Sequence, residues 1–270
     1  METVVIYQSM ADMLRCVEAS PRHHLPPKFF GGYKSTRQAC EYVRHGATPK
    51  ECETTQALLS KINDTVQHRR KMQTVAAPSG SRVVVPDVLS GMPFPMRRRI
   101  SVVHDLAPVR IVVETLVSSG VTARQLEKRG AAVAALAMRL SETRPVELWA
   151  SWGGRINGHD ALGRVKLDTN PLTLAEVVAV MTTTLFTRNV VYAQNLIQTD
   201  SRYAEHTWRW AWNEQPNDSL RDARMRAALM LEDQDIFIPG GYFDEADQFV
   251  CDPVAWVEKY VAAQRETEYD

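Results

Sequence analysis

The sequence lacks the features that identify membrane, secreted and zinc-binding proteins. Its 270 residues contain no apolar run of about 18 residues or more, so no membrane-spanning helix is expected. The amino terminus has no basic stretch followed by an apolar one, and it therefore predicts no secretory signal. The cysteines form no CxxC pair, which favours reduced, mostly buried thiols over a zinc site or a disulfide framework; they are Cys16, Cys40, Cys52 and Cys251. These absences predict a cytoplasmic protein.

The sequence motifs of common enzymes are also missing. The glycine-containing segment 153–158 matches neither the phosphate loop ending in GK[ST] nor GxGxxG, and the chain has no HExxH or GxSxG. His104-Asp105 and His159-Asp160 each place an imidazole next to a carboxylate in sequence. Adjacent residues of a strand point to opposite faces, however, so neither dipeptide predicts a catalytic pair. We therefore predict no catalytic residues, no metal, no cofactor and no enzymatic activity.

The net charge of zero conceals a strong separation of charge along the chain. Residues 22–110 contain 15 Lys and Arg against 6 Asp and Glu, a balance of 15 − 6 = +9. Residues 214–270 contain 5 against 14, a balance of 5 − 14 = −9. Such asymmetry indicates a polyanion as the partner of the basic region. The alternative is that the two regions pack together and neutralise each other.

Helices are predicted first in the amino-terminal part of the chain. The apolar periodicity over residues 7–19 is typical of a short amphipathic helix. Ser35 is a suitable cap for a second helix over 36–45, which Gly46 would end.

The clearest helix start in the sequence is Thr48-Pro49 followed by Glu51. The helix that it opens is expected to extend to Met72. Residues 74–82 then read as an exposed turn region.

The middle of the chain predicts strands on both sides of a helix. Thr122 and Gln125 form a capping box for an alanine-rich helix. Because strands precede and follow this helix, a βαβ unit is expected. The expected strands are 83–85, 100–103, 109–115 and 146–152, and the expected loops are 87–96 and 153–164.

The carboxy-terminal part is predicted to be mainly helical. Residues 189–197 fit either a strand or a helix, and Trp208, Trp210 and Trp212 fit either a buried sheet face or a stacking platform. The expected helices are 173–185, capped near Asn170, and 219–233 and 251–266.

These elements predict an α/β fold, with a mixed α+β arrangement left open. A basic, mainly helical region (residues 1–75) precedes an α/β body (83–270) that carries a sheet and acidic carboxy-terminal helices. The two regions are expected either as separate units joined at 74–82 or as one continuous domain.

Candidate binding residues fall into three basic clusters, all between residues 22 and 110. In the first, three aromatic rings lie among cations, the combination by which single strands are held: cations contact phosphates and rings stack on bases. The alternative is that Phe29 or Phe30 anchors the segment in the core, and that the other clusters are solvated charge. The clusters are Arg22, Lys28, Phe29, Phe30, Tyr33, Lys34 and Arg37; Arg69, Arg70 and Lys71; and Arg97, Arg98 and Arg99.

Three segments together resemble a family of small phage proteins: FFGGYKSTRQACEYVRHG, DVLSGMPFPMRRR and TARQLEKRGAAVAALAMRLSETRPVEL. Over its whole length the chain resembles the single-stranded-DNA-binding RNA polymerase cofactors of lytic Pseudomonas podoviruses that package a giant virion RNA polymerase. The resemblance implies a fold other than an OB barrel, action in the host cytoplasm, binding to melted middle promoters and recruitment of the phage RNA polymerase. It carries over no individual contact residues.

The leading hypothesis is a non-enzymatic single-stranded DNA-binding protein that acts as a transcription cofactor. Its expected partners are single-stranded DNA and the phage RNA polymerase, with no membrane, and homo-oligomerisation is left open. One alternative is a metal-dependent nuclease whose Asp233 or Asp235 approaches the bound strand. Another is a protein–protein adaptor whose basic half meets an acidic partner.

Overall fold

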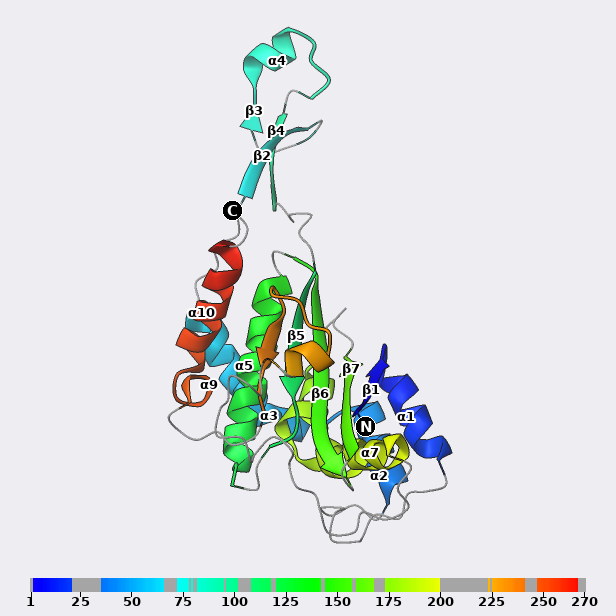
Figure 1. The fold of residues 1–270 in the computed structure, drawn as a ribbon. Coiled ribbons are helices and arrows are strands. Elements are labelled where there is room, and N and C mark those ends of the chain that lie inside the picture. Colours follow the sequence, from blue (N-terminus) through cyan, green and yellow to red (C-terminus); the bar gives the residue numbers. More distant parts are fainter. Residues whose placement is uncertain are drawn as a thin grey trace.

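The computed structural model describes a body built around an open sheet and a narrow arm that extends from it (Figure 1). The expected α/β class is confirmed, and the described strands form no closed barrel. The described residues are 2–20, 35–65, 72–77, 79, 82–94, 96–101, 108–117, 120–141, 144–156, 159–167, 173–199, 223, 225–240 and 247–266.

The body contains a five-stranded mixed sheet with the order β1-β7-β6-β5-β8. Neighbouring strands are parallel except for β6 and β7, which form an antiparallel hairpin. The strands are β1 (Glu2–Tyr7), β5 (Val109–Glu114), β6 (Val146–Ile156), β7 (His159–Lys166) and β8 (Ile236–Ile238).

Helix α5 (Ala123–Ser141) connects the parallel strands β5 and β6, so the predicted βαβ unit is confirmed. Its capping box is formed as expected. The backbone N–H of Thr122 donates to Gln125 Oε1 at 2.7 Å, and the N–H of Gln125 donates to Thr122 Oγ1 at 3.3 Å. These bonds satisfy donors that a helix start otherwise leaves open.

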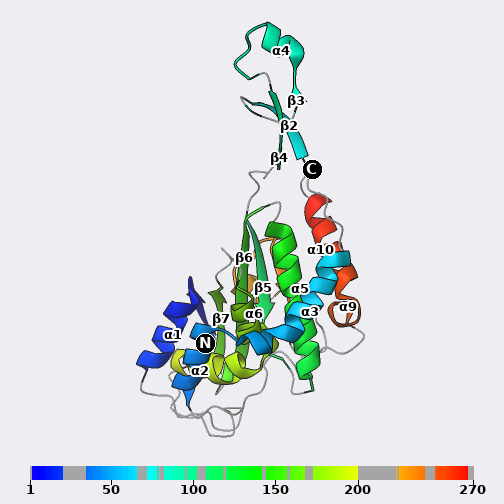
Figure 2. The ribbon, with the colours of Figure 1, turned by 180° about the vertical axis from the view of Figure 1, so that it is seen from behind.

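The alanine-rich surface of α5 allows close packing. In Figure 2, α5, α3 (Pro49–Thr65) and α10 (Pro253–Glu266) lie in front of the sheet. A Cβ on Gly130 would come within 2.3 Å of Thr182 Cγ2, so this contact requires glycine. Small residues on α5 therefore determine how closely the π-helical segment η2 (Val178–Thr182) approaches it.

The two faces of the sheet pack against different groups of residues. Ile111 and Val113 belong to the large core that includes α5. Val112, between them, belongs to a smaller cluster with Trp149 and Phe237. Successive residues of β5 are thus buried on opposite faces, which explains its continuous apolar sequence.

The amino-terminal helices begin where their caps predict. Ser35 Oγ accepts the N–H of Gln38 at the start of α2 (Thr36–His45), and Gly46 follows the helix with φ of 76°. The capping box of α3 is formed too, because Glu51 accepts the N–H of Thr48 at 2.8 Å.

The helix expected over 7–19 is confirmed as α1 (Met10–Ala19), but it begins three residues later, since Tyr7 pairs with β7 as the last residue of β1. Two other predictions in the amino-terminal half are wrong. Helix α3 does not extend to Met72, because that residue begins strand β2 (Met72–Ala77). The expected turn at 74–82 is likewise replaced by β2 up to Ala77. In both cases pairing with a later strand, β4, determines the outcome.

The loop expected over 153–164 is also wrong. Strand β6 continues to Ile156, and β7 begins at His159 and pairs back along it. Cross-strand hydrogen bonds hold glycines 153, 154 and 163 in extended conformation, although glycine has low intrinsic strand preference.

The segment 173–198 is helical with a bend, which decides the open choice at 189–197. It comprises α6 (Leu174–Val177), η2, η3 (Phe186–Val191) and α7 (Tyr192–Gln198). Among the described helices, none alone is long and apolar enough to cross a membrane. The parts Leu174–Thr182 and Phe186–Gln198, bent by 64°, reach the required length and composition only as a pair.

At the carboxy terminus α9 (Gln248–Cys251) precedes α10, which confirms the helix expected over 251–266, and Asp252 Oδ1 accepts the N–H of Ala255 at the start of α10. Asn170 and the tryptophans at 208, 210 and 212 lie outside the described residues.

Candidate nucleic-acid interface

The arm is a second, three-stranded sheet with the order β2-β4-β3, and we call its described residues between Met72 and Ser101 the β-arm. Strand β4 (Met96–Ser101) lies between β2 and β3 (Arg82–Val83), and both pairings are antiparallel. In Figures 1 and 2 the β-arm stands away from the body sheet. Among the described elements, no helix or strand of the body packs extensively against it.

The tip of the β-arm is built around a short helix, α4 (Val85–Leu89), where the sequence predicted the end of a strand at Val85 and a loop from Asp87. The helix ends in a Schellman motif: the N–H of Met92 donates to Asp87 O at 2.9 Å and the N–H of Gly91 to Val88 O at 3.2 Å. Gly91 has φ of 70°, a conformation that favours glycine. The tip therefore has a defined shape, although its chain contains several turn-forming residues.

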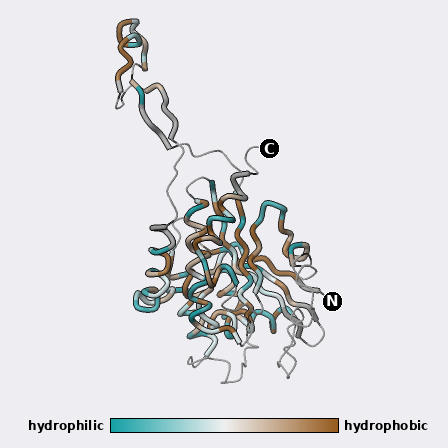
Figure 3. The backbone as a smooth tube through the Cα atoms, turned by 90° about the vertical axis from the view of Figure 1, so that its left-hand side faces the viewer, coloured by the Kyte–Doolittle hydropathy of each residue, from teal (hydrophilic) through white to brown (hydrophobic). Residues whose placement is uncertain are grey.

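Apolar side chains are exposed at this tip. Leu89 is 83 % exposed, and Phe94 is 51 % exposed. Figure 3 shows the hydrophobic colouring gathered at the end of the arm. Scattered exposed apolar residues are normal, but a contiguous group usually marks a binding surface. The group comprises Val83, Val85, Val88, Leu89, Met92 and Phe94.

Cations follow directly after the apolar tip. Arg97, Arg98 and Arg99 occupy the central strand β4, and their paired positions on β2 are Ala76, Val75 and Thr74. On the other side, position 97 pairs with Arg82. Like charges at paired positions destabilise a sheet.

One arginine of β4 has an acidic neighbour within the β-arm. Arg97 Nη2 lies 3.4 Å from Asp87 Oδ2, and both side chains remain partly exposed, at 35 % and 26 %. An ion pair of this length in solvent contributes little to stability. The β-arm is basic, because the sequence 72–101 contains four arginines and one acidic residue, Asp87. The arginines are Arg82, Arg97, Arg98 and Arg99.

The structure separates the other predicted site residues from the β-arm or leaves them undescribed. Arg37 is 82 % exposed on α2 and lies 3.5 Å from Glu41. Figures 1 and 2 both place α2 at the end of the body opposite the arm, so Arg37 and β4 do not form one surface. Outside the described residues lie Arg22, Lys28, Phe29, Phe30, Tyr33, Lys34, Arg69, Arg70 and Lys71.

The residues that the sequence reading missed are the apolar ones. Met92 and Phe94 were placed in a loop and given no role. The sequence did contain a signal, because Phe94 stands between two prolines and only two residues separate it from three arginines. An aromatic ring next to cations is the pattern that predicts a binding segment at 22–37, and the same pattern recurs here.

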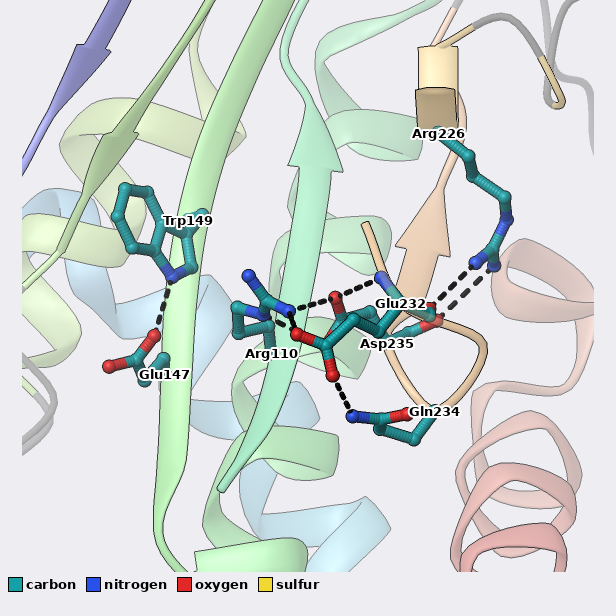
Figure 4. Close-up of polar contacts among 7 residues, drawn as sticks. All are labelled: Arg110, Glu147, Trp149, Arg226, Glu232, Gln234 and Asp235. Atoms are coloured by element: carbon teal, nitrogen blue, oxygen red, sulfur yellow. Dashed lines mark hydrogen bonds and ion pairs between the residues drawn. The ribbon is translucent and has the colours of Figure 1, made fainter. Parts of the chain in front are cut away.

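Of the two carboxylates considered for a nuclease, Asp235 has a structural role. Asp235 is fully buried and accepts Arg110 Nε at 3.0 Å and the N–H of Glu232 at 2.8 Å (Figure 4). It therefore holds the turn before β8. Asp233 is exposed. The described part of the chain contains no group of three or more His, Cys, Asp or Glu side chains that could hold a metal ion.

The comparisons with known proteins identify a family and no function. The chain belongs to the family of a domain of unknown function, DUF7192, whose model matches residues 2–265. Neither the curated proteins nor the solved structures gave a match.

Proposed function

We propose that this protein binds single-stranded nucleic acid through the β-arm. The observation that carries the proposal is the adjacency of an exposed aromatic and apolar tip to three consecutive arginines on a strand that stands away from the body. Guanidinium groups contact phosphates, and rings and other apolar side chains pack against unstacked bases.

The energetics of such a site follow from its two parts. Stacking of one base on Phe94 contributes about 1–3 kcal/mol, without sequence preference. The arginines of β4 act through phosphates, so their contribution falls as salt rises. For a single strand the logarithm of affinity changes by about −0.7 per released counterion against the logarithm of salt concentration.

The wider biological part of the proposal rests on the resemblance to phage transcription cofactors. In that setting the protein binds a melted middle promoter and recruits the phage RNA polymerase. The β-arm would hold the displaced strand, and the acidic carboxy-terminal region leaves another surface for the polymerase.

A gel-shift comparison of single- and double-stranded oligonucleotides at two salt concentrations tests the proposal. We expect preference for the single strand. The triple substitution R97A/R98A/R99A should lower affinity at least tenfold at low salt and reduce the magnitude of the salt slope by about 2. Phe94→Ala should lower affinity about tenfold and leave the slope unchanged.

The matched control is R15A/R124A/R188A, which removes the same charge from exposed positions of the body. It should leave binding within about twofold. Equal losses in the two triple variants would show that net charge, and not the β-arm, determines binding. Affinity independent of salt would also contradict the proposal. Running R69A/R70A/K71A alongside tests the second basic cluster.

A second candidate, a protein–protein adaptor, is favoured by the exposed apolar tip alone. Replacing Leu89 and Met92 by serine distinguishes the two functions. If the tip serves a protein partner, this variant keeps its nucleic-acid affinity and loses the partner in a pull-down with the phage RNA polymerase.

A further inference from the structure

Arg164 of β7 is a buried cation without a hydrogen-bonding partner at two of its nitrogens. The residue is 5 % exposed, and neither Nε nor Nη1 has a hydrogen-bond partner among the residues that the structure describes. Its Cζ lies 4.6 Å from the centre of the Trp149 ring, which is itself buried. Burying a charge is costly unless it is paired, so this arrangement needs a compensating group.

The acidic side chains on this part of the sheet are bound to other cations. Glu147 accepts Lys166 Nζ at 2.6 Å and the Trp149 indole N–H at 3.2 Å. Asp235 and Glu232 both bind Arg110, as Figure 4 shows. In the described part of the chain, no carboxylate forms an ion pair with Arg164.

Ser151 lies directly opposite Arg164. The two residues are register partners in the antiparallel pair of β6 and β7, so their side chains stand on the same face of the sheet. Ser151 is fully buried, and within the described part of the chain its Oγ also has no hydrogen-bond partner. A buried hydroxyl and a buried guanidinium, side by side and both unsatisfied, are suitable donors for one oxyanion.

Charges of both signs surround Arg164. Burial lowers the pKa of Arg164, and the positive charge of Arg110 lowers it further, whereas Asp235 and Glu147 oppose the shift. Lys166 lies 5.9 Å from the same Trp149 ring and keeps about a third of its side chain exposed. Glu147 is bound to Lys166, and Asp235 and Glu232 are bound to Arg110, so these nearby carboxylates are already engaged by other cations.

We propose that Arg164 and Ser151 form a binding site for an oxyanion group, a carboxylate or a phosphate, carried by a small molecule. Arg164 supplies the charge and Ser151 a second hydrogen-bond donor. The ring face under Arg164 is already occupied, so that face contributes by orienting the guanidinium and not by stacking on the ligand. This site lies on the body sheet and does not depend on the β-arm proposal.

Thermal unfolding of the full-length protein in a zwitterionic buffer tests the site. Inorganic phosphate and malonate are titrated separately at constant ionic strength, with sodium chloride as the ionic control. We expect a saturable rise in Tm of about 5 °C with phosphate or malonate and none with chloride. The anion that acts at the lower concentration identifies the source of the group.

Substitutions then locate the effect. Arg164→Met should abolish the anion response and, without added anion, keep or raise the Tm, because it removes an unpaired buried charge. Ser151→Ala should keep the Tm without anion and weaken anion binding about tenfold. Arg188→Met, at an exposed position, is the control and should respond as the unmodified protein does.

Three results would overturn the proposal. One is an anion response of the same size in R164M. Another is no response of the unmodified protein to phosphate or malonate beyond that to chloride. The third is a large loss of Tm in R164M without added anion, comparable to that of Arg110→Met, since it would show that the charge already has a partner within the chain. If R164M does not fold, Ser151→Ala and Arg164→Lys supply the same comparison.

Discussion

Replacing Asp235 by asparagine removes the charge that holds Arg110 at the start of β5. The carboxylate is completely buried, and its oxygens lie 3.0 and 2.9 Å from Nε and Nη2 of the guanidinium. It also accepts the N–H of Glu232. Arg110 itself is 20 % exposed, so it would be left largely buried with one remaining partner.

The expected cost is about 3 kcal/mol in the free energy of unfolding. Breaking a buried ion pair by removing one partner costs about 3–5 kcal/mol, and the lower end applies because Glu232 still contacts Arg110 at 2.7 Å. Urea unfolding followed by tryptophan fluorescence measures it.

The control is Glu232→Gln. Its side chain is 61 % exposed, so solvent screens its pair with Arg110 and the expected cost is below about 1 kcal/mol. The double variant R110M/D235N should cost less than the sum of the single changes, because Arg110→Met removes the charge left unpaired. A loss below about 1 kcal/mol for Asp235→Asn, or additive costs, would refute this account of the pair.

Two further predictions concern titrating groups. Burial alone would raise the pKa of Glu147, but hydrogen bonds from Lys166 and Trp149 outweigh it and hold the pKa below 4.5. The ionised Glu147 therefore stabilises the fold above pH 4.5, and this stabilisation is lost as the pH falls through the lower pKa of the folded protein. The urea midpoint of the unmodified protein should decline below about pH 5, and in Glu147→Gln this decline should be smaller. Parallel declines in the two proteins would contradict this. Burial raises the pKa of Cys40 to about 12, whereas Cys251 is exposed. A thiol reagent should modify Cys251 in the folded protein and Cys40 only after unfolding, as peptide mass spectrometry would show, and equal rates would count against the buried position.

Local signals predicted the helices well because a helix start is a local event. The caps at Ser35, Thr48 and Thr122 bond to backbone groups three residues away, so sequence spacing alone specifies them. The apolar residues of β5 likewise predict from the strand's own sequence that both of its faces are buried. For this reason the βαβ unit could be predicted.

Strand pairing between distant segments could not be predicted in this way. Residues 74–77 open a predicted turn region and residues 153–156 are glycine-rich, yet both segments are extended because a later strand supplies their hydrogen bonds. The same holds for the proposed interface. The three arginines of β4 were identified from sequence, but the sequence did not show that they stand on an arm next to exposed apolar residues.

The sequence by itself determined the basic clusters, the helix starts and the α/β class, since each depends on residue type and short spacing. Only the tertiary structure decided which charges are paired. Arg110 binds Asp235, more than a hundred residues away, whereas Arg164, on the same sheet, lies opposite Ser151 in the strand register and forms no ion pair with an acid among the described residues. The physical reason is that the free energy of a buried charge depends on neighbours within a few ångströms, and folding brings those neighbours from remote parts of the chain.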